Sequence, residues 1–287
     1  MTVDNGAPAR PAAGRVWLIT GASSGFGRAI AEAALAAGDT VVATARRPEA
    51  IDDLVAAHPG RAAALRLDVT DPARVAAVVA EVILWYGRVD VLVNNAGRSQ
   101  IGAVEETTDK ELRDLMELHL FGPVALVRAV LPHMRRQGSG AIVQMSSMGG
   151  QLSFAGFGAY SATKCALEGL SEALAEEVAP FGVKVLIVEP GAFRTGLFGD
   201  ALYRSDAMEA YRETVGPTRS MASGADGKQP GDPAKAAAAI LAALQADPVP
   251  LRLPLGDDAV DALVSHADRV RAELLAWEPV ARDTAFD

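Results

Sequence analysis

The chain has few cysteines and few basic residues, and both shortages narrow its chemistry. Its 287 residues contain one cysteine, Cys165, which excludes an internal disulfide framework and favours a reducing, cytoplasmic compartment. Lysine and arginine number 27 against 36 acidic residues, giving a formal charge of −9. Because a nucleic-acid face needs clustered positive charge, we expect no nucleic-acid partner.

Long apolar runs are also missing. No apolar run approaches the roughly 20 residues of a membrane span, so we expect no membrane partner. Residues 1–14 are rich in alanine, proline and glycine and lack the apolar core of a secretory signal, which predicts a mobile leader. The scattered His58, His133 and His266 show no metal-ligand spacing, and no metal site is predicted.

Short apolar runs alternate with longer amphipathic ones, which is typical of repeated βα units and a parallel sheet buried on both faces. The fold class expected for residues 15–287 is therefore α/β: a single Rossmann-type, doubly wound parallel sheet of about seven strands, with helices on both faces and a small substrate cover. The predicted strands are Val16–Thr20, Thr40–Ala45, Ala63–Leu67, Val89–Asn94, Ala141–Ser146, Val183–Val188 and Pro250–Leu255.

Helical periodicity fills the segments between these strands. The predicted helices are Phe26–Ala37, Asp52–Ala57, Pro72–Tyr86, Asp109–Arg136 and Phe157–Ala179. The cover is expected over about 196–231, as a short helix Ala201–Glu213 followed by a loop rich in glycine, serine and proline. A helix from Pro233 to about Ala246 follows, and 258–277 is an amphipathic helix that we expect to lie on the core or on a partner.

Glycines cluster between the first strand and the first helix, in Thr20-Gly21-Ala22-Ser23-Ser24-Gly25-Phe26-Gly27. A Rossmann-type turn needs glycines there so that the backbone can approach a pyrophosphate, and the helix N-terminus supplies amide donors. Glycine spacing alone is weak, and an ordinary glycine-rich loop is the alternative.

The end of the second strand bears on cofactor choice. A carboxylate there is typical of NAD sites, whereas an arginine accommodates the 2′-phosphate of NADP. Here Ala45 precedes Arg46 and Arg47, so NADP(H) is favoured over NAD(H), the alternative being two surface arginines that only face solvent. Asp68, after the third strand, is placed to meet the adenine amino group or to cap its own turn.

Tyr160 and Lys164 are four residues apart in a helical segment, so they share one helix face. A nearby ammonium stabilises a phenolate and lowers its pKa, which suits a tyrosine to proton transfer. Ser147, at the carboxyl end of the fifth strand, lies at the edge where open α/β sheets bind ligands, and its hydroxyl could polarise the same carbonyl. Ser146 is the rival candidate.

These motifs stand in the order found in the short-chain dehydrogenase/reductase family, which the chain resembles over about residues 15–195. They are Thr20-Gly21-xxx-Gly25-x-Gly27, Asn94-Asn95-Ala96-Gly97, Ser147, Tyr160-xxx-Lys164 and Pro190-Gly191. Five motifs in one order are far more specific than any one of them. Flanking residues resemble the branch with 17β-hydroxysteroid-dehydrogenase-like and retinol-dehydrogenase-like members.

The resemblance implies an oxidoreductase in which Ser147 orients the substrate oxygen, Tyr160 transfers the proton, and Lys164 tunes Tyr160 and holds the nicotinamide ribose. It also implies a set of cofactor contacts: Gly21, Ser23, Ser24 and Phe26 at the phosphates, Arg46 at the 2′-phosphate, Asp68 and Val69 at the adenine, Asn95 at the inner ribose, Pro190 and Thr195 at the nicotinamide amide, and their motif neighbours Gly25, Gly27, Ala96, Gly97 and Gly191.

One position departs from the family pattern. His119 stands where the family usually carries an asparagine that bends its helix and helps to hold a water connecting the lysine to solvent. Two interpretations compete: His119 relays protons itself, since an imidazole titrates near neutrality, or it is a packed helix residue. Packing is favoured because a lone helical histidine is more often structural.

The pocket wall is expected to be apolar, which suits a hydrophobic ketone or aldehyde and its alcohol. The candidate wall residues are Met148, Leu152, Phe154, Phe157, Phe193, Leu197, Phe198, Leu202 and Tyr203. Two alternatives stay open: a redox-neutral enzyme on the same scaffold, such as an epimerase, dehydratase or cyclase, and a non-catalytic cofactor-binding protein. The resemblance further implies a homodimer or homotetramer.

Overall fold

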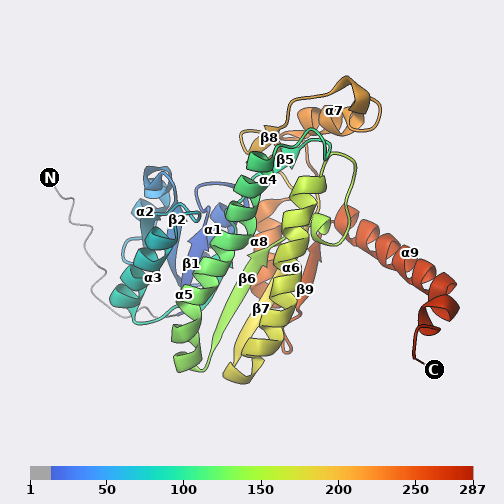
Figure 1. Cartoon of the computed structure of the whole chain (residues 1–287). Helices are drawn as coiled ribbons and strands as arrows, with labels where there is room; N and C mark the ends of the chain where they lie inside the picture. Colours follow the sequence, from blue (N-terminus) through green and yellow to red (C-terminus); the bar gives the residue numbers. More distant parts are fainter. Residues whose placement is uncertain (1–13, 287) are drawn as a thin grey trace.

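Seven parallel strands form the central sheet of this computed structural model, which describes residues 14–286. The sheet order β3-β2-β1-β4-β6-β7-β9 confirms the expected α/β, Rossmann-type architecture (Figure 1). The strands are β1 Val16–Thr20, β2 Thr40–Ala45, β3 Ala62–Arg66, β4 Val91–Asn94, β6 Gly140–Met145, β7 Val183–Pro190 and β9 Arg252–Leu255. The leader predicted over 1–14 lies, except for Gly14, outside the described residues.

Alternate side chains of each central strand pack to opposite faces, because successive residues of a strand point in opposite directions. In β1, Trp17 and Ile19 belong to the apolar core beneath α1 (Gly25–Ala36) and α8 (Pro233–Ala243). Val16 and Leu18 belong to the core on the opposite face. That second core lies beneath α3 Pro72–Tyr86, α5 Gly122–Gln137 and α6 Gly158–Val178.

The helix predicted over Asp109–Arg136 is confirmed as one unbroken helical segment, Asp109–Gln137, but it is not α-helical throughout. It consists of α4 (Asp109–Met116), a π-helical turn over Glu117–Phe121 that contains His119, and α5. By length and composition alone, the whole segment Asp109–Gln137 could cross a membrane. This corrects the expectation that no apolar run in the chain approaches the length of a membrane span. In the fold, Leu126 and Val130 of this segment are fully buried against the sheet, as expected of a core helix.

The cover differs from its prediction. Leu202–Arg204 forms strand β8, which pairs in parallel with β5 (Ser99–Ile101), so the helix predicted over Ala201–Glu213 is wrong. The helix of the cover is α7 (Gly216–Ala225), in the stretch expected to be a loop. A separate apolar cluster of Ile101, Ala103, Leu202, Val215 and Ala222 stabilises this arrangement, and its members come from distant parts of the sequence.

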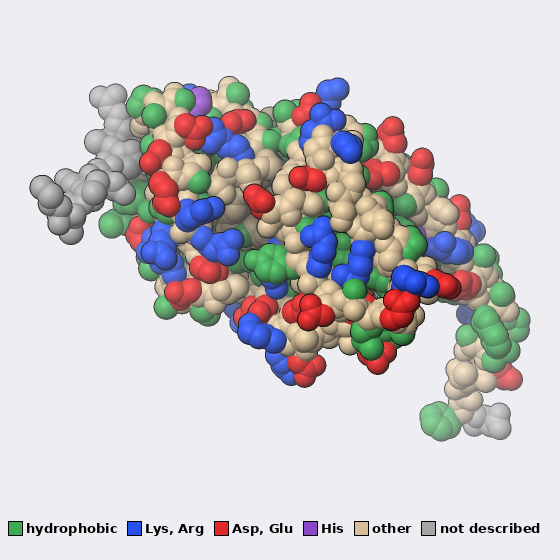
Figure 2. Space-filling model, turned by 90° about the horizontal axis from the view of Figure 1, so that it is seen from above, with side chains coloured by type: hydrophobic (Ala, Val, Ile, Leu, Met, Phe, Trp, Pro, Cys, Tyr) green, Lys and Arg blue, Asp and Glu red, His purple; other side chains and the backbone are tan. Residues whose placement is uncertain are grey.

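The C-terminal helix α9 (Asp257–Arg282) is longer than predicted and extends away from the body of the molecule (Figures 1 and 2). Only Ala259 and Leu263, near its start, are buried, so most of the helix does not lie on the core. Its exposed large apolar side chains are Val260, Val264, Val270, Leu274, Leu275, Trp277 and Val280. The described residues also form the short α-helix α2, Asp52–Ala57, and five 3-10 helices: Pro48–Ile51, Met148–Gly150, Ala179–Phe181, Gly196–Phe198 and Glu209–Tyr211.

Candidate active site

The predicted site residues come together at the carboxyl edge of the sheet, where β1, β4, β6 and β7 end and where the cover lies. Figure 2 views the molecule from this edge, and basic side chains gather on the side of the sheet where β2 and β3 lie. Ligands of open α/β sheets bind outside the carboxyl ends of the strands, at the point where the strand order reverses. In this sheet the order reverses between β1 and β4.

The glycine turn is packed too closely for side chains. Gly21 and Gly25 have φ of 65° and 56°, which is the left-handed region that favours glycine. A Cβ on Gly21 would lie 2.9 Å from Ala96 Cα, and one on Gly27 would overlap the Gly21 carbonyl. The turn therefore matches the requirement for close backbone approach to a phosphate.

The N-terminus of α1 follows this turn. Ser24 is its N-cap residue, but the Ser24 side chain accepts no hydrogen bond from the helix. Amides of the first turn are therefore left for another acceptor, and the helix dipole favours an anion at this end. Ser23 and Ser24 are exposed beside these amides. This donor set fits the pyrophosphate of a dinucleotide.

Asn95 clamps the turn from β4. Its Nδ2 donates to the carbonyls of Thr20 (2.8 Å) and Gly21 (3.1 Å). The Thr20 hydroxyl in turn accepts the backbone N–H groups of Asn95 (2.9 Å) and Ala96 (3.0 Å). The geometry thus gives the Asn95 amide nitrogen a structural task besides the ribose contact implied by resemblance.

The segment after β7 closes against the same turn. Phe193 stacks at a tilt on Phe26, with ring centroids 5.1 Å apart. Thr195 lies so near Gly25 that a Cβ there would be 3.2 Å from Thr195 Cβ. Gly191, just after Pro190, donates its N–H to the Leu255 carbonyl at 2.9 Å. The predicted phosphate and nicotinamide contacts are therefore neighbours in space.

At the end of β2, Arg46 and Arg47 are both exposed. Asp68 uses one carboxylate oxygen to accept the backbone N–H (3.0 Å) and the hydroxyl (2.8 Å) of Thr70, which is the turn-capping role that the sequence left open. Val69 is 5% exposed and packs beneath Gly122, at the start of α5.

Ser147 and Tyr160 form the centre of the predicted catalytic group. Ser147 follows β6, and its Oγ accepts the Gly149 N–H at 3.1 Å. Burial raises the pKa of Tyr160 to about 12 and outweighs the lowering effect of the neighbouring Ser147 hydroxyl. Ser146, the rival, is buried and donates its hydroxyl to Glu168. The structure therefore points Ser147, not Ser146, to Tyr160.

Lys164 lies on the same face of α6 as Tyr160, with Nζ 5.7 Å from the tyrosine ring centre. Nζ donates to the Met145 carbonyl at 2.8 Å, and burial lowers the Lys164 pKa to about 8. The sequence predicted that the ammonium would lower the pKa of Tyr160. In this structure the net shift is upward, because desolvation of the phenol is the largest effect on its pKa.

His119 sits in the π-helical turn and is 1% exposed. Its Nε2 accepts the Arg98 backbone N–H at 3.2 Å, so the ring proton must reside on Nδ1, which lies 2.8 Å from Thr163 Oγ1. The Thr163 hydroxyl donates to the Tyr160 carbonyl at 2.7 Å. Burial lowers the His119 pKa well below its usual value, and nearby Lys164 and Arg98 lower it further.

Sequence reasoning missed Thr163, because a threonine inside a helix carries no signal until its partner across the fold is known. It also missed Glu168 and Arg252, whose side chains meet from α6 and β9. Thr163 and Glu168 lie within about one helical turn of Tyr160 or Lys164, and Arg252 contacts Glu168. Of these three residues, Glu168 alone has a signal in the sequence: it stands four residues after Lys164 and so lies on the same helix face.

The apolar residues expected to line the pocket divide into three groups. Leu152, Phe193 and Leu202 are at most 9% exposed and pack the body or the cover. Phe154 and Tyr203 are exposed, at 49% and 47%. Met148, Leu197, Phe157 and Phe198 are half-buried. The rings of Phe157 and Phe198 have centroids 6.5 Å apart, and Phe157 is 6.2 Å from the Tyr160 ring. Phe157 and Phe198 are thus the best candidates for substrate contact.

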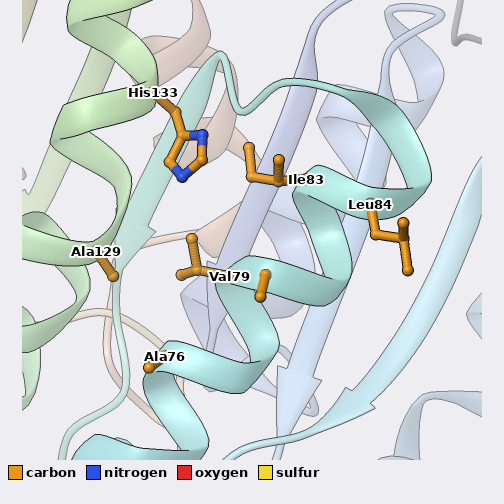
Figure 3. A pocket seen from close by; sticks show the side chains of 7 residues that line it. Ala76, Val79, Ile83, Leu84, Ala129 and His133 are labelled. Atoms are coloured by element: carbon orange, nitrogen blue, oxygen red, sulfur yellow. The ribbon is translucent and has the colours of Figure 1, made fainter.

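A surface groove of about 500 Å³ lies elsewhere, between α3 and α5 (Figure 3). Its lining is apolar apart from His133, and it contains none of the predicted site residues. The residues that line it are Ala76, Val79, Ala80, Ile83, Leu84, Ala129 and His133. With one titratable side chain, whose pKa burial lowers, this groove has no catalytic group comparable to Tyr160.

Known proteins resemble this chain along most of its length. Oxidoreductase BOA17 of Botryotinia fuckeliana is 39% identical over 272 residues, which is 94% of this chain and 99% of that protein. A crystal structure of a short-chain dehydrogenase from Streptomyces avermitilis is 68% identical with a TM-score of 0.90, covering 94% of this chain and 100% of that one.

Two further solved structures hold a nucleotide. A metagenomic short-chain oxidoreductase in complex with NADP is 35% identical with a TM-score of 0.60, over 64% of this chain and 86% of that one. A Burkholderia phymatum enzyme in complex with NAD is 24% identical with a TM-score of 0.79, over 94% and 96%, and shows likeness of fold alone. The family model described as short chain dehydrogenase matches residues 15–204. The chain therefore belongs to the short-chain dehydrogenase/reductase family of oxidoreductases.

Proposed function

We propose that this family member is an NADP(H)-dependent enzyme that reduces a hydrophobic ketone or aldehyde to its alcohol, or catalyses the reverse. The observation that carries the proposal is the meeting of Ser147, Tyr160 and Lys164 at the carboxyl edge of the sheet, beside the glycine turn. A bound NADP(H) would supply or accept the hydride, and the protein contributes position and electrostatics.

Tyr160 is the proposed acid/base. With its pKa raised to about 12, the free site holds a protonated phenol at neutral pH, ready to donate to a carbonyl oxygen. Ser147 would donate a hydrogen bond to the same oxygen and so stabilise the negative charge that develops there. Lys164, cationic below about pH 8, favours the phenolate left after transfer.

The preference for NADP(H) rests on the end of β2. Arg46 and Arg47 are exposed there and no acid occurs before Glu49, so the position offers a cation to a 2′-phosphate and no carboxylate to ribose hydroxyls. The NADP complex of the metagenomic relative is in keeping with this preference. The NAD complex, at 24% identity, does not bear on it.

The substrate class follows from the side chains around Tyr160. Phe157 and Phe198 are half-buried, contact the cover, and present aromatic surface near the reacting phenol. Burial of apolar substrate surface there would contribute about 25 cal/mol per Å². A bulky hydrophobic carbonyl compound gains more from such a wall than a small polar one does.

The test follows NADPH absorbance with a panel of hydrophobic ketones and aldehydes, with NADH in parallel. We expect stoichiometric NADPH oxidation, and a loss of about 100-fold or more in kcat for Tyr160→Phe while NADPH binding is retained. Product formation without net change in cofactor would instead favour a redox-neutral epimerase, dehydratase or cyclase.

The proposal includes self-association as a homodimer or homotetramer, measurable by light scattering.

A further inference from the structure

A second buried charged group lies beneath the catalytic side chains. Glu168 is one helical turn after Lys164 on α6, and it is 2% exposed. Ser146 Oγ donates to one of its carboxylate oxygens, and Arg252 of β9 pairs with the other. The strand end that carries Ser147 is thereby tied to α6 twice, through Lys164 to Met145 and through Glu168 to Ser146.

Negative charge is in excess around this group. Arg252 also contacts Glu189, which lies in β7 and is fully buried, and Glu172, which is exposed; both distances are 2.7 Å. One guanidinium therefore faces three carboxylates. Gln151 donates to the same Glu189 oxygen, and the other Glu189 oxygen has no hydrogen-bond partner among the described residues.

The Glu168 carboxylate has no room to move. A Cβ on Gly150 would overlap it, so the Gly150 backbone lies directly against the carboxylate. With Ser146 and Arg252 on its other sides, the carboxylate is held in one position. A buried charge of fixed position acts strongly on its neighbours, because little water screens it.

We propose, on the basis of the function proposed above, that Glu168 is a positioning residue for Lys164: its carboxylate keeps the ammonium charged and directed to the Met145 carbonyl beside Tyr160, and thus sets the upper pH limit of the reaction. The charged and titratable groups around the pair are Tyr160 and His119 on the Lys164 side and Arg252, Glu189 and Glu172 on the Glu168 side.

The directions of the pKa shifts agree with this geometry. Burial lowers the Lys164 pKa to about 8, and the Glu168 charge opposes that shift. Burial raises the Glu168 pKa to about 7, against the hydrogen bond from Ser146 and the pairing with Arg252. Removing the carboxylate charge should therefore lower the Lys164 pKa further.

The decisive variants are Glu168→Gln, which removes the charge while keeping an acceptor for Ser146, and Glu168→Asp, which keeps the charge. Glu172→Gln is the matched control, because Glu172 also contacts Arg252 but is exposed. For NADPH-dependent ketone reduction, E168Q should move the alkaline limb of kcat/KM down by about one pH unit. E172Q should leave the alkaline limb at its wild-type position, and E168D should keep it close to that position. Equal shifts in E168Q and E172Q, or none in E168Q, would overturn the proposal.

A second measurement does not depend on activity or on any variant. In wild-type protein with isotope-labelled lysine, the Lys164 side-chain resonance should show its own titration near pH 8 and a smaller inflection near pH 7 from Glu168. A single inflection would contradict the coupling. Should no carbonyl compound be reduced while both inflections are present, the proposed function fails and the Lys164–Glu168 relationship stands.

Discussion

The Nδ1 atom of His119 lies 2.8 Å from the Oγ1 atom of Thr163, and this contact joins the π-helical turn to the helix that carries Tyr160. The chain of donors runs from Arg98 N–H to His119, from His119 to Thr163, and from Thr163 to the Tyr160 carbonyl. Because each member has its partner, the imidazole is held neutral in one tautomer. This arrangement suits a residue that holds Tyr160 in place.

Thr163→Val should destabilise the protein. Thr163 is fully buried, and valine of nearly the same shape would leave the His119 N–H without an acceptor, at a cost of about 1–3 kcal/mol. The free energy of unfolding in urea measures the loss. Ser171→Ala is the control, because the buried Ser171 hydroxyl donates to the Leu167 carbonyl of its own helix and has no other partner among residues 14–286. An equal loss in both variants would argue against a special role for Thr163.

His119→Asn should keep turnover within a few-fold of wild type. Asparagine can donate to Thr163 and accept from Arg98, and a histidine whose pKa is well below its usual value does not change charge at neutral pH. Steady-state kinetics across the pH range provide the check. A large loss with a shifted pH profile would show that the imidazole takes part in proton transfer.

Arg46→Ala should raise KM for NADPH by about tenfold or more and leave KM for NADH nearly unchanged, because a charge-assisted contact to a 2′-phosphate is lost. Arg47→Ala is the matched control, since Arg47 is also exposed and follows directly. Comparable losses with both nucleotides would mean that Arg46 does not select NADP(H).

Activity in the direction of reduction should fall as pH rises through about 8, where Lys164 loses its proton. The effect on stability has the opposite sign. The unfolded lysine keeps its proton up to its ordinary pKa of about 10.4, so between about pH 8 and 10 the unfolded state binds more protons, and this group's contribution to stability rises with pH. Lys164→Met should remove that rise, as chemical denaturation at several pH values would show.

Glu106→Gln should loosen the cover. The buried Glu106 carboxylate accepts the N–H groups of Ala103 (2.7 Å) and Met208 (2.8 Å) and pairs with Arg219 of α7 at 2.7 Å. Without its charge, Arg219 is left half-buried and unpaired, so we expect faster limited proteolysis within 205–225 and a higher KM for substrate. Glu105→Gln, which removes the charge from an exposed acceptor of the Tyr211 hydroxyl, should change neither.

Local sequence was sufficient to predict the central sheet and the shared helix face of Tyr160 and Lys164. Buried strands such as β1 read as short apolar runs, and the four-residue spacing of Tyr160 and Lys164 places them on one helix face whatever the rest of the chain does. The glycine turn follows for the same reason, because φ in the left-handed region is a local requirement.

Features that join distant segments could not be predicted in this way. The pairing of β5 with β8, the helix α7, and the contacts of His119 with Thr163 and of Glu168 with Arg252 each bring together residues more than 40 positions apart, or depend on such contacts. The pKa of Tyr160 belongs here too, since its direction depends on how deeply the folded chain buries the phenol.

The sequence by itself determined the seven strands of the central sheet, the position of the glycine turn and the placing of Tyr160 and Lys164 on one helix face, because these depend on local periodicity and spacing. Only the tertiary structure decided which serine faces Tyr160, how His119 is bonded and what surrounds Lys164. The burial and the charge environment of these positions depend on side chains from several elements between α4 and β9, and no single segment of the sequence includes all of those side chains.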